Sequence, residues 1–179
     1  MKSKKTNNLI LTALFAALIF VTVRFIPAFP LGNMGYVNFG DTFIYLGALM
    51  LPAPFAMLAG AVGAGLADLS FNAVLWVIPT VIIKSLLALA AQPFTKYAKG
   101  VWRDIGIALC GVITVGGYYL AEVVLLRFFI AAADGWHAAF IGAAASILGN
   151  TMQALVCGIA FVLISSAMHR VPFFCKFWK

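Results

Sequence analysis

Apolar residues fill most of this chain in six runs, and each run ends at a short break that contains proline, glycine or charged residues. The runs cover residues 9–26, 41–51, 55–69, 74–91, 105–132 and 138–167. A helix of about 20 apolar residues crosses a bilayer, so the pattern predicts an all-α integral membrane protein with six transmembrane helices. The run 41–51 is short for a span, and we expect a helix that is tilted or partly buried by protein. We expect residues 1–179 to form a single membrane domain.

The breaks mark the predicted loops. Pro27, Pro30 and the glycines around them cannot continue a helix, and Pro52 and Pro54 close the second run. The stretch from Pro93 to Asp104 is predicted to be another loop. The third run is rich in glycine and alanine, and such small residues let helix backbones approach closely in lipid.

Charge decides between a membrane and a nucleic-acid partner. The chain is 64% hydrophobic and 9% charged, with a mean hydropathy of +1.07, which excludes a soluble domain. The formal net charge is +7, but the basic residues gather before the first run, between the fourth and fifth runs, and at the C-terminal end. This is the positive-inside pattern, so we expect both termini in the cytoplasm and no nucleic-acid partner. The N-terminal lysines resemble a signal peptide, but no small-x-small cleavage site follows, and we expect an uncleaved first helix.

Only five acidic residues occur, and each is costly in lipid, by about 2.5–3.5 kcal/mol at a helix centre on insertion scales. Asp41 follows Asn38 in an outer segment rich in glycine, where a cap for the second helix and a place in a lid over a ligand pocket are compatible roles. We expect the 27–41 segment to gate that pocket, since its glycines permit the backbone angles a lid needs. Asp68, with Trp76 beyond it, flanks the next outer turn, where a helix cap and an interfacial tryptophan are the alternative.

Further polar residues lie inside the last three runs at similar depth. Lys84 is near the middle of the fourth run, and a buried ammonium needs a partner unless it snorkels to the cytoplasmic side. Tyr118 and Glu122 share one helix face, as do Asn150 and Gln153. These groups predict a ligand pocket, with interhelical hydrogen bonds that only join the bundle as the alternative. We expect Lys84 and Glu122 to offset each other and to favour a ligand of little net charge.

The sequence lacks the motifs of several common enzyme and nucleotide-binding classes. The sequence has no phosphate-cradling G-x-x-x-x-G-K-[ST], no nucleophile elbow and no H-E-x-x-H. The three cysteines are far apart, and those inside apolar runs are typical packing residues. We therefore expect no catalytic residue, metal or cofactor in this chain. Ala13 and Ala17 form a small-x-x-x-small face in the first run, a weak signal on its own.

Taken in order, these segments resemble the substrate-binding S component of an energy-coupling factor (ECF) vitamin transporter. The matching pieces are Ala13-x-x-x-Ala17, Asn38-Phe39-Gly40-Asp41, Gly63-Ala64-Gly65-Leu66-Ala67-Asp68 and Pro79-Thr80-Val81-Ile82-Ile83-Lys84. The nearest subgroup comprises the riboflavin, hydroxymethylpyrimidine and pyridoxine types. The resemblance covers nearly the whole chain and implies a six-helix fold in the plasma membrane of a prokaryote.

The resemblance also implies function. The alanine face of the first helix would dock on a membrane partner, the T component, which sits on two ABC-type ATPases that bind ATP and Mg²⁺. The S component would bind a vitamin and carry its pocket across the membrane by toppling. We expect hydroxymethylpyrimidine or pyridoxine as ligand, with aromatic faces and a few hydrogen-bonding groups around the ring. Riboflavin or pantothenate is the alternative within the family.

Two hypotheses from other functional classes are alternatives to a transporter subunit. Asp41 and Asp68 could form the carboxylate dyad of a small intramembrane aspartyl hydrolase such as a lipoprotein signal peptidase. That dyad needs both acids at one depth on facing helices, whereas both are predicted in or beside loops. A small transporter or channel that works without ATPase partners is the other alternative.

Overall fold

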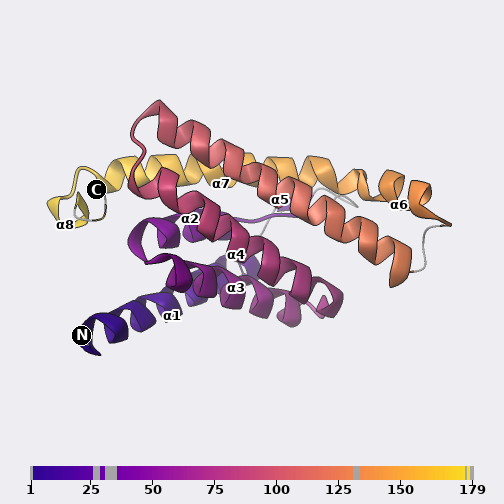
Figure 1. Ribbon diagram of the computed structural model, residues 1–179, viewed down its shortest axis with the longest axis horizontal. Coiled ribbons are helices and arrows are strands. Elements are labelled where there is room, and N and C mark those ends of the chain that lie inside the picture. The colour runs from indigo at the N-terminus through magenta and orange to yellow at the C-terminus, as the bar shows by residue number, and fades with distance from the viewer. Residues whose placement is uncertain (1, 26–28, 31–35, 131–133, 176, 178–179) are drawn as a thin grey trace.

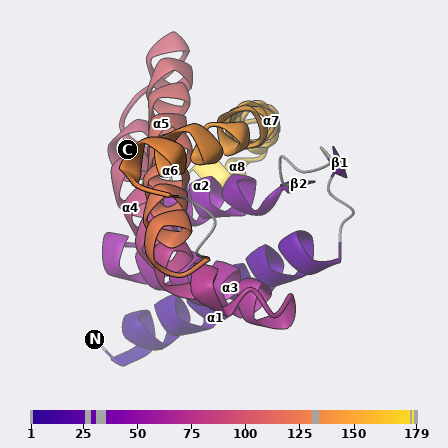
Figure 2. The ribbon, with the colours of Figure 1, turned by 90° about the vertical axis from the view of Figure 1, so that its right-hand side faces the viewer.

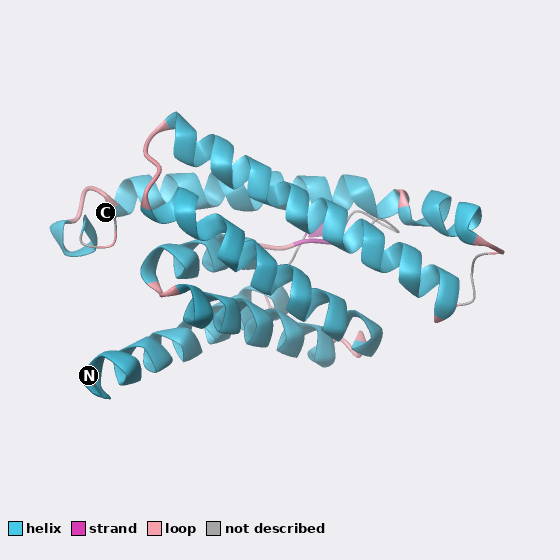
Figure 3. Ribbon diagram, viewed as in Figure 1, coloured by secondary structure: helices cyan, strands magenta, loops and turns pink. Residues whose placement is uncertain are grey.

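The computed structural model describes residues 2–25, 29–30, 36–130, 134–175 and 177, and its helices bundle around a short central one. The helices are α1 (Lys2–Arg24), α2 (Gly40–Met50), α3 (Ala53–Ser70), α4 (Val74–Lys96), α5 (Val101–Phe128), α6 (Trp136–Ala143), α7 (Ala145–Met168) and α8 (Pro172–Cys175). Two two-residue strands, β1 (Phe29–Pro30) and β2 (Tyr36–Val37), pair antiparallel between α1 and α2. Figure 3 shows how much of the described chain is helical.

Five helical stretches are long and apolar enough to cross a membrane: α1, α3, α4, α5 and the run 136–168 that joins α6 to α7. Their large apolar side chains are widely exposed, as on Ile78, Val112 and Leu163. Exposed aliphatic faces on every long helix suit lipid and not water. The chain is a multi-pass membrane protein.

The short helix α2 lies in the middle of the bundle. It has 11 residues, of which nine are buried, and it packs against α1, α3, α4 and α7. Figure 2 shows it between α7 on one side and α1 with α3 on the other. The expectation that this helix is partly buried by protein is confirmed. At a rise of about 1.5 Å per residue it covers about 17 Å, roughly half of the hydrocarbon layer.

The long helices run roughly along one direction. In Figure 1 the start of α1, the end of α7 and the connection between α4 and α5 all lie at the left-hand end of the bundle. The described basic residues of these three segments therefore lie at the same end of the structure. The opposite end carries the α3–α4 turn, where Asn72 adopts the left-handed conformation (φ 58°) that asparagine tolerates.

The small face of α3 brings three helices together. A Cβ added at Gly63 would lie 2.6 Å from the Ala16 carbonyl oxygen of α1, and one at Gly60 would lie 3.1 Å from the Lys84 carbonyl oxygen of α4. Glycine is needed at Gly63 because the α1 backbone occupies the space of a side chain. The prediction of close packing by these small residues is confirmed.

Three predicted boundaries are wrong. Helix α4 continues through Pro93 to Lys96 and α5 begins at Val101, so the loop predicted over Pro93–Asp104 shrinks to residues 97–100. Helix α5 ends at Phe128 instead of residue 132. The sixth run divides at Ala144 into α6 and α7.

The continuation of α4 has a physical reason. Its last turns carry Gln92 and Lys96, which donate to the Leu51 carbonyl oxygen over 2.7 and 2.6 Å. They satisfy backbone acceptors at the C-terminal end of α2, which would otherwise be orphaned in the bundle. Proline is tolerated in membrane helices when neighbouring groups compensate, so Pro93 does not end the helix.

Candidate functional site

A buried ion pair lies at the centre of the bundle. Lys84 Nζ, on α4, lies 2.6 Å from Asp41 Oδ1, in the first turn of α2. Asp41 is 1% exposed and Lys84 is 4% exposed. Lys84 comes ten residues after the start of α4, about 15 Å along the helix axis, which is about half the thickness of the hydrocarbon layer. The short central helix thus brings a carboxylate to mid-depth, where the ammonium needs one.

Three more polar side chains complete a cluster around this pair. Thr114 Oγ1 on α5 donates to Asp41 Oδ2 over 3.3 Å, and Gln153 Nε2 on α7 donates to the same oxygen over 3.2 Å. Asn38 Nδ2 donates to Gln153 Oε1 over 3.0 Å. We call Asn38, Asp41, Lys84, Thr114 and Gln153 the central polar cluster. It joins α4, α5 and α7 to α2 and the residues before it.

A second group extends from this cluster towards the α3–α4 turn. Lys84 Nζ lies 5.0 Å from the centroid of the Tyr118 ring, and the Tyr118 hydroxyl lies 3.1 Å from Thr80 Oγ1. The Trp76 ring lies 5.9 Å from the Tyr118 ring, centroid to centroid. Trp76, Thr80 and Lys84 are spaced by four along α4 and so share one face. With Asp68 on α3, the residues Trp76, Thr80 and Tyr118 form what we call the outer group.

Asp68 gives the outer group its charge. Its carboxylate interacts with the Thr80 side chain and with the charge of Lys84. The Asp68 Oδ2 atom is buried and makes no hydrogen bond in the described part of the chain. Asp41 holds the Lys84 ammonium in a direct contact of 2.6 Å, and Asp68 lies within electrostatic range of the same ammonium. Asp68 is left with an acceptor that a bound donor could satisfy.

Seven of the nine predicted binding residues come together in these two groups: Asn38, Asp41, Asp68, Trp76, Lys84, Tyr118 and Gln153. Glu122 and Asn150 do not join them, since no side-chain contact among the described residues links either one to the cluster. The expected pairing of Lys84 with Glu122 is wrong, because Lys84 pairs with Asp41. Whether any of these side chains touches a ligand stays a prediction.

Two alternatives weighed for the acidic residues are also resolved by geometry. Asp41 is not the cap of α2, because the N-cap residue is Phe39, which makes no side-chain cap bond; Asn38 Oδ1 accepts from the Gly40 amide over 2.8 Å. In place of a second carboxylate, Asp41 faces Lys84, Thr114 and Gln153. An aspartyl dyad needs two carboxylates that share a proton, and this contact pattern does not provide one.

Sequence reasoning missed Thr80, Thr114 and Cys157. Cys157 Sγ donates to the Asn38 carbonyl oxygen over 3.0 Å, and its own carbonyl accepts from Thr42 Oγ1 over 3.2 Å. Each missed residue stands four positions from a predicted one on the same helix, a spacing that could have revealed it. In the described ranges no group of three His, Cys, Asp or Glu residues is placed to hold a metal ion.

The predicted lid lies partly outside the described residues, which exclude 26–28 and 31–35. Of the segment 27–41, the described part includes β2, which packs on α7, and the buried residues Val37 and Asn38. Gating by this segment stays a prediction.

The predicted docking residues Ala13 and Ala17 lie on the outer face of α1 and are exposed. Ile10, Leu14 and Val21 continue that face, with exposed fractions between 45% and 62%. The opposite face of α1 is buried against α2 and α3, with which the helix makes its contacts.

Comparison with known proteins agrees with this architecture. Residues 3–170 match the model of a family described as "ECF-type riboflavin transporter, S component". Over 94 residues the chain is 33% identical to a Pyrococcus woesei protein described as "Uncharacterized protein in gap 3'region". That match covers 52% of this chain and 63% of the relative. No solved structure matches the chain.

Proposed function

This chain belongs to the family of ECF-type riboflavin transporter S components, and we propose that it is the substrate-binding subunit of an ATP-driven vitamin importer. The observation that carries the proposal is the arrangement of the two polar groups at the centre of a lipid-exposed bundle. Buried charges and amides are costly in a membrane and mark substrate sites there. The Lys84–Asp41 ion pair and the amides would form the polar base of the binding pocket, and the outer group would supply the residues that contact a ligand.

We propose that the ligand is a small ring-shaped vitamin or precursor, with hydroxymethylpyrimidine or pyridoxine as the first candidates. Trp76 and Tyr118 lie 5.9 Å apart and offer faces for a ring. The unpartnered Asp68 Oδ2 would accept a hydrogen bond from an amino or hydroxyl group on the ring edge. Riboflavin is the second candidate, favoured by the description of the matching family model.

The proposed topology has six crossings with both termini in the cytoplasm. Five helical stretches have the length of a span, and α2 would make the sixth crossing together with residues 36–39, which precede it. Residues 36–39, which begin with the strand β2, and the 11-residue helix cover at most about 30 Å, the thickness of the hydrocarbon layer. Val37 and Asn38 are buried, as non-helical backbone must be at that depth.

The energy would come from partner chains. We propose that the exposed α1 face around Ala13 and Ala17 docks on a T component that sits on two ABC-type ATPases, where ATP and Mg²⁺ bind. The chain itself would then be no enzyme and would bind neither ATP nor metal. This proposal rests on the family and on the small, exposed surface of α1.

The test is purification of the full chain in detergent, followed by mass spectrometry of any small molecule that co-purifies. A vitamin panel is then titrated while the quenching of tryptophan fluorescence is followed. Trp76→Phe should remove most of the quenching, whereas Trp102→Phe, at an exposed position, should keep it. Tight binding of pantothenate or biotin, with no response to pyridoxine, hydroxymethylpyrimidine or riboflavin, would refute the ligand class but leave a transporter subunit. A chain that binds no vitamin with or without its membrane partners would contradict the function.

A further inference from the structure

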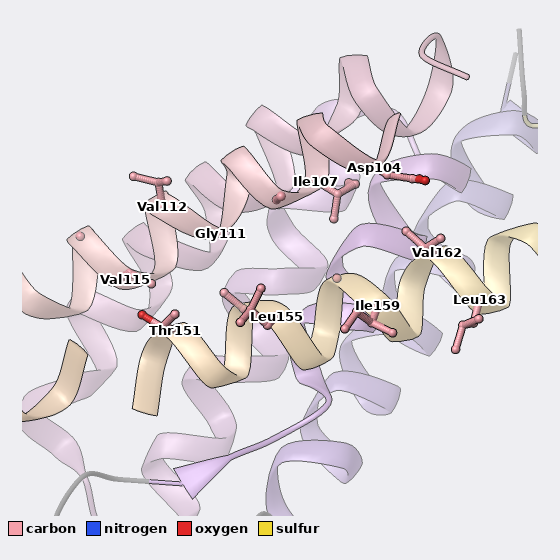
Figure 4. Close-up of a pocket in the computed structure, with 14 residues that line it drawn as sticks. Asp104, Ile107, Gly111, Val112, Val115, Thr151, Leu155, Ile159, Val162 and Leu163 are labelled. Carbon is pink, nitrogen blue, oxygen red and sulfur yellow. The ribbon is translucent and has the colours of Figure 1, made fainter. Parts of the chain in front are cut away.

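A groove separate from the polar site runs between α5 and α7 and encloses a cavity of about 640 Å³. Figure 4 shows Ile107 and Val115 of α5 and Leu155 and Val162 of α7 pointing into the space between the two helices, with Asp104 at one end. No residue of the central polar cluster or the outer group lines it. A water-soluble vitamin would find almost no hydrogen-bonding partner there.

Small residues hollow out the groove. Gly111, Gly116 and Gly158 all line it, and a Cβ added at Gly116 would meet no atom within 4 Å. Val112, Ile159 and Leu163 on its rim are 60–66% exposed, so the groove opens on the lipid-facing surface. Without an occupant, its aliphatic lining would lose the dispersion contacts that close packing provides.

The dimensions fit one lipid chain. The lining extends over residues 104–116 of α5 and 151–163 of α7. At a rise of about 1.5 Å per residue each stretch covers about 18 Å, and the hydrocarbon half of one leaflet is about 15 Å thick.

Basic groups gather where the groove ends at Asp104. Arg103 Nε lies 2.9 Å from Asp104 Oδ1, and Arg103 Nη2 donates to Ser166 Oγ on α7 over 3.4 Å. Beyond the spanning part of α7, burial and the charges of Arg103 and Lys99 lower the pKa of His169. Lys99 lies two residues before α5 and His169 directly after α7, so both belong to the end at which Arg103 joins the two helices. Arg170 follows His169 in the chain. Three permanent cations, Lys99, Arg103 and Arg170, thus belong to the end of α5 and α7 that holds the single carboxylate of Asp104.

We propose that this groove binds an anionic phospholipid, with one acyl chain between α5 and α7 and the phosphate headgroup at the basic end. The apolar lining selects the chain, and the surplus positive charge at the end selects the headgroup. The leaflet on this side would be the cytoplasmic one in the proposed topology, where anionic lipids attract basic residues near the surface.

The test uses the full chain in detergent with phosphatidylglycerol or phosphatidylcholine of identical acyl chains, and native mass spectrometry to count the retained lipids. We expect preferential retention of phosphatidylglycerol. Lys99→Gln and Arg170→Gln should each lower that preference about fivefold, the effect of one basic residue near an anionic surface. Lys5→Gln, at the far helix α1, is the matched control and should change nothing.

A second pair of variants tests the acyl-chain site. Gly116→Leu fills the open space of the groove and should abolish retention of the preferred lipid, whereas Ala145→Leu, exposed on α7 outside the groove, should keep it. Thermal unfolding of both variants checks that they remain folded. Equal retention of the two lipids by the unaltered protein would overturn the proposal, as would retention that survives Gly116→Leu. A protein that retains no lipid but forms a dimer dissociated by Gly116→Leu would assign the groove to a second copy and also overturn it.

Discussion

At the scale of single residues, the contact between Lys84 and Asp41 explains how a lysine is kept in the middle of a membrane bundle. Each charge alone would be costly there, and their 2.6 Å contact, with Thr114 and Gln153 on the far carboxylate oxygen, offsets that cost. Such pairs add little net stability, but the loss of one member leaves a buried charge without compensation. The pair therefore constrains where α2, α4, α5 and α7 can sit.

The first prediction follows from this asymmetry. Lys84→Met and Asp41→Asn should each lower the free energy of unfolding by about 3–5 kcal/mol, because each leaves a partner charge buried and unpaired. The double variant Lys84→Met with Asp41→Asn should recover much of that loss. Lys99→Met, at an exposed position, is the control and should unfold like the parent. The measurement is thermal or denaturant unfolding in detergent, and additive losses in the double variant would contradict the pairing.

The second prediction concerns Asp68, the carboxylate that is not in direct contact with Lys84. Asp68→Asn should weaken the binding of hydroxymethylpyrimidine, because the unpartnered oxygen would lose its charge-assisted hydrogen bond to the amino group, worth about 1.5–3 kcal/mol or roughly 10- to 150-fold in Kd. The analogue with a hydrogen atom in place of the amino group has no donor there and should be little affected. Asp104→Asn, outside both polar groups, is the control. Equal losses for the two ligands, measured by titration calorimetry, would show that Asp68 does not read the ring edge.

Sequence alone identified most of these residues but not their partners. Lys84, Asp41 and Gln153 stand out as polar positions in apolar runs, and this contrast is visible without coordinates. The pairing of Lys84 depended on the depth that the Asp41 end of α2 reaches, and sequence reasoning placed Asp41 at an outer loop. Threonines such as Thr114 were overlooked because a hydroxyl is cheap in a membrane helix and does not stand out by composition.

At the scale of elements, close approach at the glycines of α3 sets the packing of the first four helices. Gly63 meets the α1 backbone at Ala16, and Gly60 meets the α4 backbone at Lys84. The sequence predicted this face, since small residues in lipid allow helices to approach. It did not predict the end of α4, because this depends on the contacts of Gln92 and Lys96 with the Leu51 carbonyl.

The third prediction tests that packing. Gly63→Ala should destabilise the protein by about 1–3 kcal/mol, the usual cost of overpacking, because its Cβ would lie 2.6 Å from the Ala16 carbonyl oxygen and 2.8 Å from Ile19 Cβ. Gly116→Ala is the matched control, since its Cβ meets nothing within 4 Å and alanine favours a helix by about 0.5–1 kcal/mol. We expect the two melting temperatures to move in opposite directions. A Gly63→Ala protein as stable as the parent would mean that α1 and α3 can separate without loss.

At the scale of the whole molecule, the polar site and the proposed docking face belong to different parts of the bundle. Asp41 links the core to α4, α5 and α7, whereas α1 turns Ala13 and Ala17 outward and packs with α2 and α3 behind them. Binding of ligand and binding of a partner membrane chain should then be separable by mutation. That the start of α1 and the end of α7 lie at one end of the bundle was predictable from charge alone, because the basic residues are segregated along the sequence.

The last prediction uses that separation. Ala13→Trp together with Ala17→Trp should prevent co-purification with the T component and its ATPases, since the indole rings would hold the partner helix away from a face on which small residues permit contact. The Kd of the isolated chain for the vitamin should stay within about twofold of the parent value, because these side chains point away from α2 and the polar site. A twofold change in Kd corresponds to less than about 0.5 kcal/mol of binding free energy. Ala145→Trp, equally exposed but on α7, is the matched control and should leave the complex intact. Intact assembly with both bulky residues on α1 would refute the docking face, and loss of vitamin binding together with assembly would show that the two surfaces are not independent.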